Sequence, residues 1–355
     1  MSRPVRVMIV EDSLVVRQLL SHIIGRDPRF VVAAAVESAE AALAEIERVK
    51  PDVISMDIRL PGMDGLEATR RIMSEHPTPI VVIADAVEDA SLRISMNALK
   101  AGALTVVEKP TGPASASYEH LADTICTQLF IMSSVPVIRR RNIGAPSPVR
   151  APITTGARRG PFEQLDYLAL AASTGGPPAL ARVLGGLPAD FPAPAFVVQH
   201  MGAAFMEGFA RWLDGQTPLS VKVPSDGETA EPGFVYVAPG DRHLAVRIGG
   251  VMRLTRDPPQ GGQRPSANVL FSSLAQSAGE RTLAVLLTGM GEDGAAGLAD
   301  LATAGGHTIA EHASTAVVNG MPGAAVRLRA ARDVLPLDLI APRILQRASL
   351  GRAAS

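Results

Sequence analysis

Little in this 355-residue sequence points to an extracellular, membrane-spanning or nucleic-acid-binding protein. It has one cysteine, Cys126, so no internal disulfide can form, which is typical of a chain in a reducing compartment. No apolar run approaches the roughly 18–20 residues that a membrane-spanning helix requires. The 34 Lys and Arg residues nearly balance the 35 Asp and Glu residues, and a net charge of -1 does not favour a nucleic-acid surface. We therefore expect a soluble cytoplasmic protein that is not inserted in a membrane and binds no nucleic acid.

The composition also excludes a disordered chain, since 47% of the residues are hydrophobic and only 19% are charged. Domains usually contain about 100–200 residues, so this length predicts two of them. A middle stretch rich in proline, glycine, serine and arginine has no periodicity and is typical of a linker. The predicted divisions are a first domain at residues 1–133, the linker at 134–162 and a second domain at 163–348. Cys126 lies in a helix-patterned stretch and is interpreted as a packing residue.

Short apolar runs alternate with stretches of helical periodicity in both domains. In the first domain the runs that predict buried strands are residues 5–10, 31–36, 53–56, 80–83 and 104–107. In the second domain they are residues 167–172, 195–199, 234–238, 282–287 and 307–310. Residues 244–248 and 251–254, joined through Gly249 and Gly250, are typical of a hairpin. The predicted fold class is α/β: a five-stranded, parallel, doubly wound sheet, followed by a doubly wound, mostly parallel domain with an antiparallel edge hairpin.

Charged residues directly follow three predicted strands of the first domain. Glu11 and Asp12 follow the first strand, Asp57 follows the third, and Lys109 follows the fifth. The carboxyl ends of parallel strands meet at one edge of the sheet, so these side chains should lie together. Three carboxylates repel one another unless they share a hard cation such as Mg²⁺. A carboxylate beside Mg²⁺ and an ammonium group is arranged for phosphoryl transfer, with Asp57 as the attacking group.

These residues resemble those of a response-regulator receiver domain, over about residues 4–132. The motifs that carry the resemblance are VEDS at 10–13, MDIRLPGMDG at 56–65 and EKP at 108–110. The resemblance implies a flavodoxin-like fold, with Asp57 as the phosphoacceptor and Lys109 as its support. It also implies a Mg²⁺ site formed by Glu11, Asp12 and Asp57.

One position departs from the receiver pattern. Such receivers carry Ser or Thr after the fourth strand, and its hydroxyl binds the phosphoryl group and relays the switch. This chain has Ala84 there, followed by Asp85. Alanine cannot make that hydrogen bond, and an acid beside a phosphoryl group would repel it.

A candidate nucleophile follows the first predicted strand of the second domain. Ser173 lies between that strand and helix-patterned residues 179–184, where helix N-terminal N–H groups are available to an oxyanion. Gly175 and Gly176 allow close backbone approach. The alternative interpretation is a plain helix N-cap serine. The Gly-x-Ser-x-Gly pattern of α/β-hydrolases is not present here.

A serine nucleophile needs a base, and an acid that orients the base. By position, His200 and His312 follow strands and are both candidates for the base, whereas His307 begins a strand and should lie at the opposite end of the sheet. Asp293 is the best candidate for the acid, because residues 288–294 also follow a strand.

The second domain resembles the chemotaxis protein-glutamate methylesterase (CheB) family over about residues 165–345. Its motifs are ASTGG at 172–176, QHM at 199–201, VAPGDRHL at 237–244, RPSANVLF at 264–271 and LTGMGEDGA at 287–295. The resemblance implies Ser173 as nucleophile, His200 as base and Asp293 as the orienting acid. It further implies the Met290 backbone as an oxyanion donor, with Thr174 close by. Two positions differ from the usual family pattern: Asn268 replaces an aspartate, and Glu311-His312 replace a Gln–Asp-like pair.

The function implied is a phosphorylation-gated serine hydrolase that removes glutamyl methyl esters from chemoreceptors and deamidates their glutamines. Its partners would be methyl-accepting chemoreceptors and a chemotaxis histidine kinase, with Mg²⁺ in the receiver and no cofactor in the catalytic domain. One alternative is a receiver-linked protein-interaction adaptor without catalysis. Another is a dinucleotide site, because Gly289, Gly291 and Gly294 form a G-x-G-x-x-G pattern with Glu311 at the end of the next strand. Acids within that glycine loop would repel a pyrophosphate, which argues against it.

Overall fold

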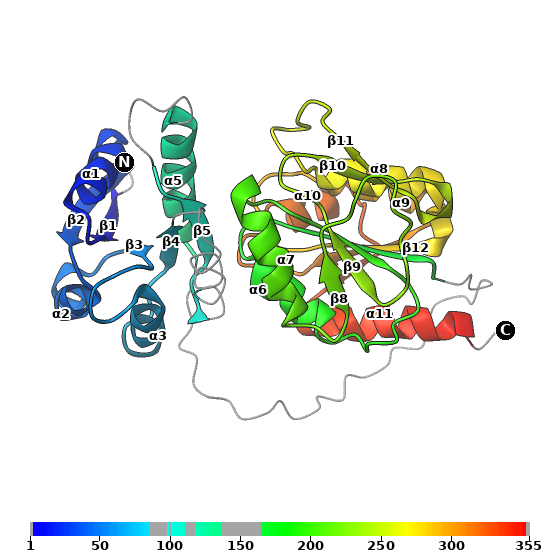
Figure 1. Cartoon of the computed structure of the whole chain (residues 1–355), viewed down its shortest axis with the longest axis horizontal. Helices are drawn as coiled ribbons and strands as arrows, with labels where there is room; N and C mark the ends of the chain where they lie inside the picture. The colour runs from blue at the N-terminus through cyan, green and yellow to red at the C-terminus, as the bar shows by residue number, and fades with distance from the viewer. Residues whose placement is uncertain (1–2, 85–97, 99–100, 111–117, 136–164, 353–355) are drawn as a thin grey trace.

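The computed structural model describes residues 3–84, 98, 101–110, 118–135 and 165–352, without the side chains of His120 and residues 349–352. These residues form two α/β domains, blue to blue-green and green to red in Figure 1. Most of the predicted linker lies outside the described residues, so the predicted domain divisions stay predictions. None of the described helices combines the length and the apolar character needed to cross a bilayer.

The first domain is built on a five-stranded, wholly parallel sheet, as predicted, with strand order β2-β1-β3-β4-β5. The strands are β1 (Val5–Val10), β2 (Phe30–Val36), β3 (Val53–Asp57), β4 (Ile80–Ala84) and β5 (Thr105–Glu108). The helices are α1 (Leu14–Arg26), α2 (Ala39–Val49), α3 (Gly65–Glu75) and α5 (Tyr118–Met132).

Helices cover both faces of this sheet, because successive side chains of a strand point to opposite faces. Val7 and Ile9 of β1 pack in one hydrophobic cluster with α1 and α5, whereas Met8 and Val10 pack in another with α2 and α3. Figure 1 shows the two helix pairs on opposite sides of the strands. A strand buried on both faces has a continuous apolar run, which explains why β3 and β4 were predictable. The edge strand β2 is only partly buried and was recognised from its apolar composition.

Cys126 of α5 lies in the α1–α5 cluster, where its Sγ is 3.8 Å from the carbonyl oxygen of Ile23. Burial raises the pKa of this thiol to about 11. A thiol in that state is a poor nucleophile, in agreement with its interpretation as a packing residue.

The second domain contains a seven-stranded sheet of order β14-β13-β12-β6-β7-β9-β8, in which every neighbouring pair is parallel. Its strands are β6 (Tyr167–Ala172), β7 (Ala195–Gln199), β8 (Ser220–Lys222), β9 (Phe234–Val237), β12 (Thr282–Leu286), β13 (His307–Glu311) and β14 (Asp333–Leu335). Its helices are α6 (Gly176–Leu184), α7 (Met206–Asp214), α8 (Ala267–Ser277), α9 (Ala295–Thr303), α10 (Met321–Arg327) and α11 (Leu337–Arg352). Short 3₁₀ turns cover Ala203–Phe205, Ile248–Gly250 and Gly279–Arg281.

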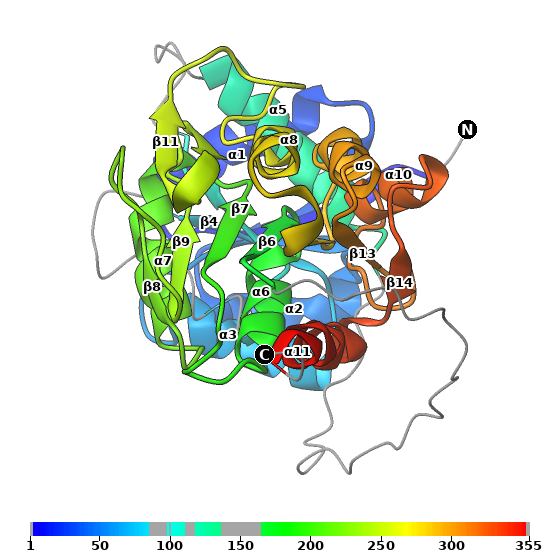
Figure 2. The same ribbon diagram turned by 90° about the vertical axis from the view of Figure 1, so that its right-hand side faces the viewer.

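This sheet is also doubly wound. Figure 2 shows its strands side by side from β8 to β14, with α8, α9 and α10 on one face and α6 and α11 on the other. Alternate residues of β6 divide between the two faces: Ala169 and Ala171 pack towards α8 and α9, and Leu168 and Leu170 pack towards α6 and α11. The carboxyl ends of β6, β7 and β12 lie next to one another at one edge, because these strands are neighbours in the sheet.

The predicted hairpin forms, but not at the edge of this sheet. It consists of β10 (His243–Val246) and β11 (Met252–Thr255), which make an antiparallel two-stranded sheet of their own. Gly249 and Gly250 in the connection have φ values of 81° and 78°, which only glycine adopts readily. The hairpin packs against α8, where Ser273 Oγ accepts a hydrogen bond from the Val246 N–H at 2.9 Å. The fold class is as predicted, and the position of the hairpin is the detail that differs.

The two domains touch close to the carboxyl edge of the second sheet. Val318, in the loop after β13, packs against the α1–α5 cluster of the first domain. A Cβ placed on Gly202, two residues beyond His200, would lie 4.0 Å from the carboxylate of Glu108 in β5. Figure 1 shows β5 and α5 on the side of the first domain that faces the second.

Candidate active site and acidic site

Ser173 lies in a tight turn between β6 and α6. Gly175 has a φ of 76°, and a Cβ there would lie 2.6 Å from Val317, so only glycine fits this turn. Gly176 leaves room for the side chain of Gln199, whose Nε2 donates to the carbonyl oxygens of Ser173 and His200, both at 2.9 Å. Gln199 therefore ties the serine turn to the end of β7.

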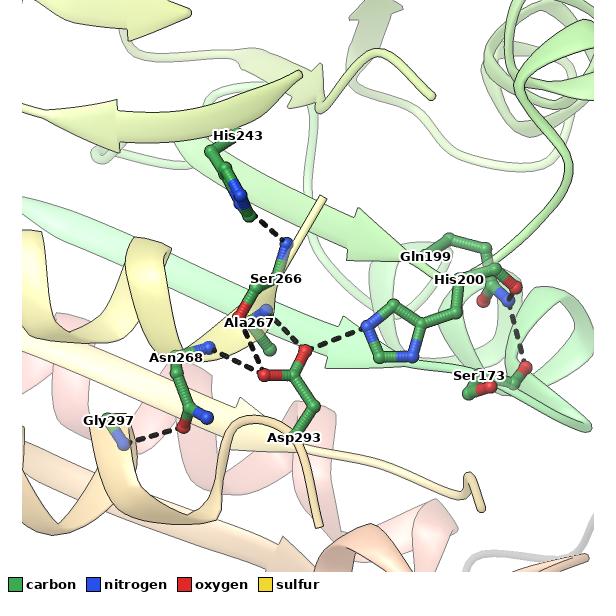
Figure 3. Close-up of polar contacts among 9 residues, drawn as sticks. All are labelled: Ser173, Gln199, His200, His243, Ser266, Ala267, Asn268, Asp293 and Gly297. Atoms are coloured by element: carbon green, nitrogen blue, oxygen red, sulfur yellow. Dashed lines mark hydrogen bonds and ion pairs between the residues drawn. The ribbon is translucent and has the colours of Figure 1, made fainter. Parts of the chain in front are cut away.

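His200 and Asp293 meet at the same edge. His200 Nε2 is 2.8 Å from Asp293 Oδ2, and the two side chains are 7% and 6% exposed. Figure 3 shows the imidazole of His200 between the Asp293 carboxylate and Ser173. Among the hydrogen bonds of the described residues, none joins the Ser173 hydroxyl to His200. Such catalytic contacts are often long before substrate binds.

Asp293 lies at the N-terminus of α8, which stabilises its negative charge. Its Oδ1 accepts hydrogen bonds from Ser266 Oγ at 2.7 Å and from Asn268 N–H at 3.2 Å, and its Oδ2 accepts one from Ala267 N–H at 2.6 Å. Burial by itself would raise the pKa of Asp293, but the hydrogen bonds from His200, Ser266 and Ala267 outweigh it and lower the pKa. Asp293 is therefore ionised, and both of its carboxylate oxygens are hydrogen-bonded. Its negative charge would repel a pyrophosphate, which disfavours the dinucleotide alternative for this glycine loop.

Met290 and Thr174 both lie beside the serine. A Cβ placed on Gly289 would lie 2.8 Å from Ser173 Cβ, so the turn that begins at Gly289 packs directly against the nucleophile turn. Met290 is 44% exposed, and Thr174 is buried. Within the described chain, the backbone N–H groups of Met290 and Thr174 make no hydrogen bond, which leaves both available to an oxyanion.

Sequence reasoning missed the residues that hold this arrangement together. Gln199 and Ser266 lie inside the quoted motifs but were given no role. Thr288 was also missed: its carbonyl oxygen accepts the Ser173 N–H at 3.0 Å, and its Oγ1 donates to the Thr174 carbonyl oxygen at 2.9 Å. A serine directly before a helix-patterned stretch is an N-cap signal, which was the one clue available for Ser266.

The other histidines of this domain lie away from Asp293. His243 is buried behind Ser266, whose N–H donates to His243 Nδ1 at 3.2 Å. His312 is exposed, and its Nδ1 accepts from Ser314. His307 begins β13 at the opposite end of the sheet, as predicted, and is 2.8 Å from Asp333. Asn268 Oδ1 accepts the Gly297 N–H at 2.8 Å, so this residue joins α8 to α9.

The acidic residues of the first domain converge as the strand order requires. Lys109 Nζ lies 2.8 Å from Asp57 Oδ2 and 3.0 Å from Glu11 Oε2. Carboxylate oxygens of Glu11, Asp12 and Asp57 lie within 4.8 Å of one another, an arrangement able to hold a metal ion. Burial raises the pKa of Asp57, and burial together with the charge of Asp57 raises that of Glu11 to about 7. Lys109 offsets this repulsion only in part.

Two oxygens of this cluster are left incompletely satisfied. Glu11 Oε2 and Asp57 Oδ2 are buried and accept no hydrogen bond of good geometry, although both face Lys109. Hard cations prefer such oxygens as ligands, so the donor set fits Mg²⁺. Ala84 ends β4 next to this site, where its side chain is buried and its carbonyl oxygen accepts the Lys109 N–H at 3.0 Å. Asp85 lies outside the described residues.

Both domains match families of known proteins. A family model described as CheB methylesterase matches residues 168–344, and one described as response regulator receiver domain matches residues 7–116. Protein-glutamate methylesterase/protein-glutamine glutaminase 2 of Paramagnetospirillum magneticum is 51% identical over 347 residues, 97% of each chain. Protein-glutamate methylesterase/protein-glutamine glutaminase 4 of Myxococcus xanthus is 44% identical over 96% of each chain. The crystal structure of the Thermotoga maritima CheB methylesterase catalytic domain is similar with a TM-score of 0.50 at 38% identity, covering 51% of this chain and 97% of that domain.

Proposed function

Because this chain belongs to the CheB methylesterase family and carries a response regulator receiver domain, we propose that it is a phosphorylation-gated serine hydrolase acting on glutamyl methyl esters. The same acyl chemistry would deamidate glutamine side chains, in line with the glutaminase names of its relatives. The observation that carries the proposal is the His200–Asp293 pair beside Ser173. An intact site of this kind disfavours the adaptor without catalysis.

One hydrogen bond, between Nε2 and Asp293, assigns the roles of the two ring nitrogens of His200. Ionised Asp293 accepts a hydrogen bond from His200 Nε2, so the proton of the neutral imidazole is on Nε2. Nδ1 is then the basic nitrogen, and it takes the proton of Ser173 as the hydroxyl oxygen attacks the ester carbonyl. Asp293 stabilises the imidazolium that forms.

The tetrahedral intermediate carries a negative oxygen that needs donors. The N–H groups of Met290 and Thr174 are available beside Ser173, and the N-terminus of α6 lies behind it. Collapse of this intermediate expels methanol, which receives its proton from His200, and leaves an acyl group on Ser173. Water activated by His200 then releases the glutamate side chain.

The receiver domain regulates this site through Asp57, which accepts the phosphoryl group. Glu11, Asp12 and Asp57 would hold Mg²⁺, and that cation supplies neutralisation of phosphoryl charge beside Lys109. The receiver packs on Val318, which is hydrogen-bonded to Thr288, and it comes close to Gly202, two residues beyond His200. Phosphorylation that loosens this packing would therefore reach the catalytic groups through few residues. Ala84 lacks the hydroxyl of the usual relay, so this contact must carry the signal without it.

The substrates we propose are methyl-accepting chemoreceptors, and the phosphodonor is a chemotaxis histidine kinase in the cytoplasm. The test is methanol release from methylated receptor membranes, comparing wild type, Ser173→Ala and Asp57→Asn, each with and without acetyl phosphate and Mg²⁺. We expect no release with Ser173→Ala and unstimulated release with Asp57→Asn. Equal release by wild type and Ser173→Ala would contradict the hydrolase, and equal stimulation of Asp57→Asn would contradict the gate.

A further inference from the structure

A buried carboxyl group outside the proposed triad lies beneath the active-site turns. Glu311, the last residue of β13, is 1% exposed. Its Oε2 accepts the Thr288 N–H at 2.8 Å, whereas its Oε1 is buried and accepts no hydrogen bond. Burying an acid with one unsatisfied oxygen costs free energy, so the role of Glu311 depends on the groups that it holds in place.

Thr288 transmits the position of Glu311 to both active-site turns. Its carbonyl oxygen accepts the N–H of Ser173 at 3.0 Å, and its Oγ1 donates to the carbonyl oxygen of Thr174 at 2.9 Å. The same Oγ1 accepts the N–H of Val318 at 2.9 Å, and the carbonyl oxygen of Val318 accepts the N–H of Gly289 at 3.0 Å. One residue thus links the nucleophile turn, the Met290 turn and the loop that follows β13.

The surroundings of Glu311 favour the neutral acid. Burial raises the pKa of Glu311, and the hydrogen bond from the Thr288 N–H offsets this only in part. Among the described residues no charged group contributes: β12 leads to the uncharged Thr288, and β14 pairs with Glu311 through Leu335. The neighbouring titratable residue, His312, is exposed and bonded to Ser314.

We propose that Glu311 is a positioning residue for the ester hydrolysis, which acts through Thr288 as the neutral acid and misaligns the Ser173 and Met290 turns when it ionises. This rests on the proposed hydrolase function. An unpaired charge at this depth is costly, and the groups around Glu311 must shift to reduce that cost. The loop after β13, which packs Val317 on Gly175 and bonds Val318 to Thr288, lies against the same turns. Activity then becomes sensitive to pH through a group that contacts neither substrate nor the reacting atoms.

The sign of the effect follows from the direction of the shift. A carboxyl whose pKa is raised in the folded protein contributes its full stabilisation below its ordinary value of 4.5, and this is lost as pH rises through the raised value. Glu311→Gln keeps an acceptor for Thr288 and cannot ionise. The ratio of Glu311→Gln activity to wild-type activity should therefore rise as pH rises through the raised pKa, which lies above 4.5.

The experiment compares wild type with the variants Glu311→Gln, Glu311→Ala and His312→Gln. Each is measured between pH 5 and 9 at intervals of about one pH unit. Two readouts are taken: methanol release from methylated receptors, and the rate at which a fluorophosphonate labels Ser173. We expect both ratios for Glu311→Gln to rise with pH and His312→Gln to parallel wild type. Glu311→Ala should be slower by roughly tenfold throughout, because Thr288 loses its acceptor, and Glu311→Gln should restore that rate.

Parallel profiles for wild type and Glu311→Gln would overturn the proposal, as would a pH dependence that disappears in His312→Gln. If Glu311→Ala does not fold, the comparison of wild type with Glu311→Gln still decides. Labelling of Ser173 that follows the expected profiles without any methanol release would keep Glu311 as a positioning residue and reject the methylesterase.

Discussion

The catalytic domain contains two His–Asp pairs with the same N···O distance but different roles. His200 Nε2 and Asp293 Oδ2 are 2.8 Å apart, and so are His307 Nε2 and Asp333 Oδ2. The first pair lies at the carboxyl edge of the sheet beside Ser173. The second lies at the amino edge, where β13 and β14 begin.

The surroundings of the two pairs explain the difference. The second nitrogen of His200 faces Ser173, whereas Nδ1 of His307 is buried without a partner among the described residues. Asp293 is held by the N-terminus of α8, whereas Asp333 is held by Arg343 of α11 at 2.7 Å. Burial lowers the pKa of His307, and Asp333 only partly offsets it. A close His–Asp contact is therefore not evidence of catalysis unless a nucleophile lies on the other side of the ring.

The sharpest test applies the same substitution to both acids. Asp293→Asn should reduce methanol release by about 10⁴-fold, because an amide no longer selects the tautomer with its proton on Nε2. Asp333→Asn should leave the rate near that of wild type, because no reacting group touches it. Both rates are measured on folded protein, as judged by circular dichroism. Comparable losses in the two variants would show that the pairs are not functionally distinct.

A smaller effect is expected from the donors that hold Asp293. Ser266→Ala removes the hydrogen bond to Oδ1, while the bonds from Ala267 and Asn268 remain. Loss of one hydrogen bond to a buried carboxylate costs about 1.5–3 kcal/mol, so kcat should fall by roughly ten- to a hundredfold with KM little changed. Ser273→Ala, which removes a serine hydroxyl on the same helix far from the acid, is the matched control. A change in KM alone would indicate a role in substrate binding instead.

The smallest effect is on stability. Asp333→Asn should lower the free energy of unfolding by about 1–3 kcal/mol, because Arg343 and buried His307 lose a charged partner. Hydrogen bonds from His307 and Arg343 lower the pKa of Asp333 to about 2 in spite of its burial. A lowered carboxyl pKa contributes stability above its ordinary value of 3.8 that is lost as pH falls towards about 2.

The difference in stability between wild type and Asp333→Asn should therefore shrink over that range. Urea unfolding at several acidic pH values measures it. A difference that stays constant down to pH 2 would mean that Asp333 contributes nothing through its charge.

The elements that were predictable are those with a strong local signal. All ten apolar runs became strands. Most of these strands are buried on both faces and must therefore be apolar throughout. β8 and β14 were missed, because each has only three residues and these are polar or exposed in part. Each forms only by pairing with a neighbouring strand, β8 with β9 and β14 with β13. The hairpin was recognised from its glycines, but its position depended on packing against α8, which no local pattern encodes.

The sequence by itself determined the two domain families, the alternation of strands and helices, and the residues that follow strand ends. These are local properties: apolar periodicity, glycine at tight turns and short motifs. The motifs already implied the pairing of His200 with Asp293. The tertiary structure decided that the N-terminus of α8 stabilises this acid and that Glu311 is buried beneath Thr288. Those outcomes depend on contacts between residues far apart in the chain. The pKa of each acid likewise depends on burial and on hydrogen-bond donors that only folding brings together.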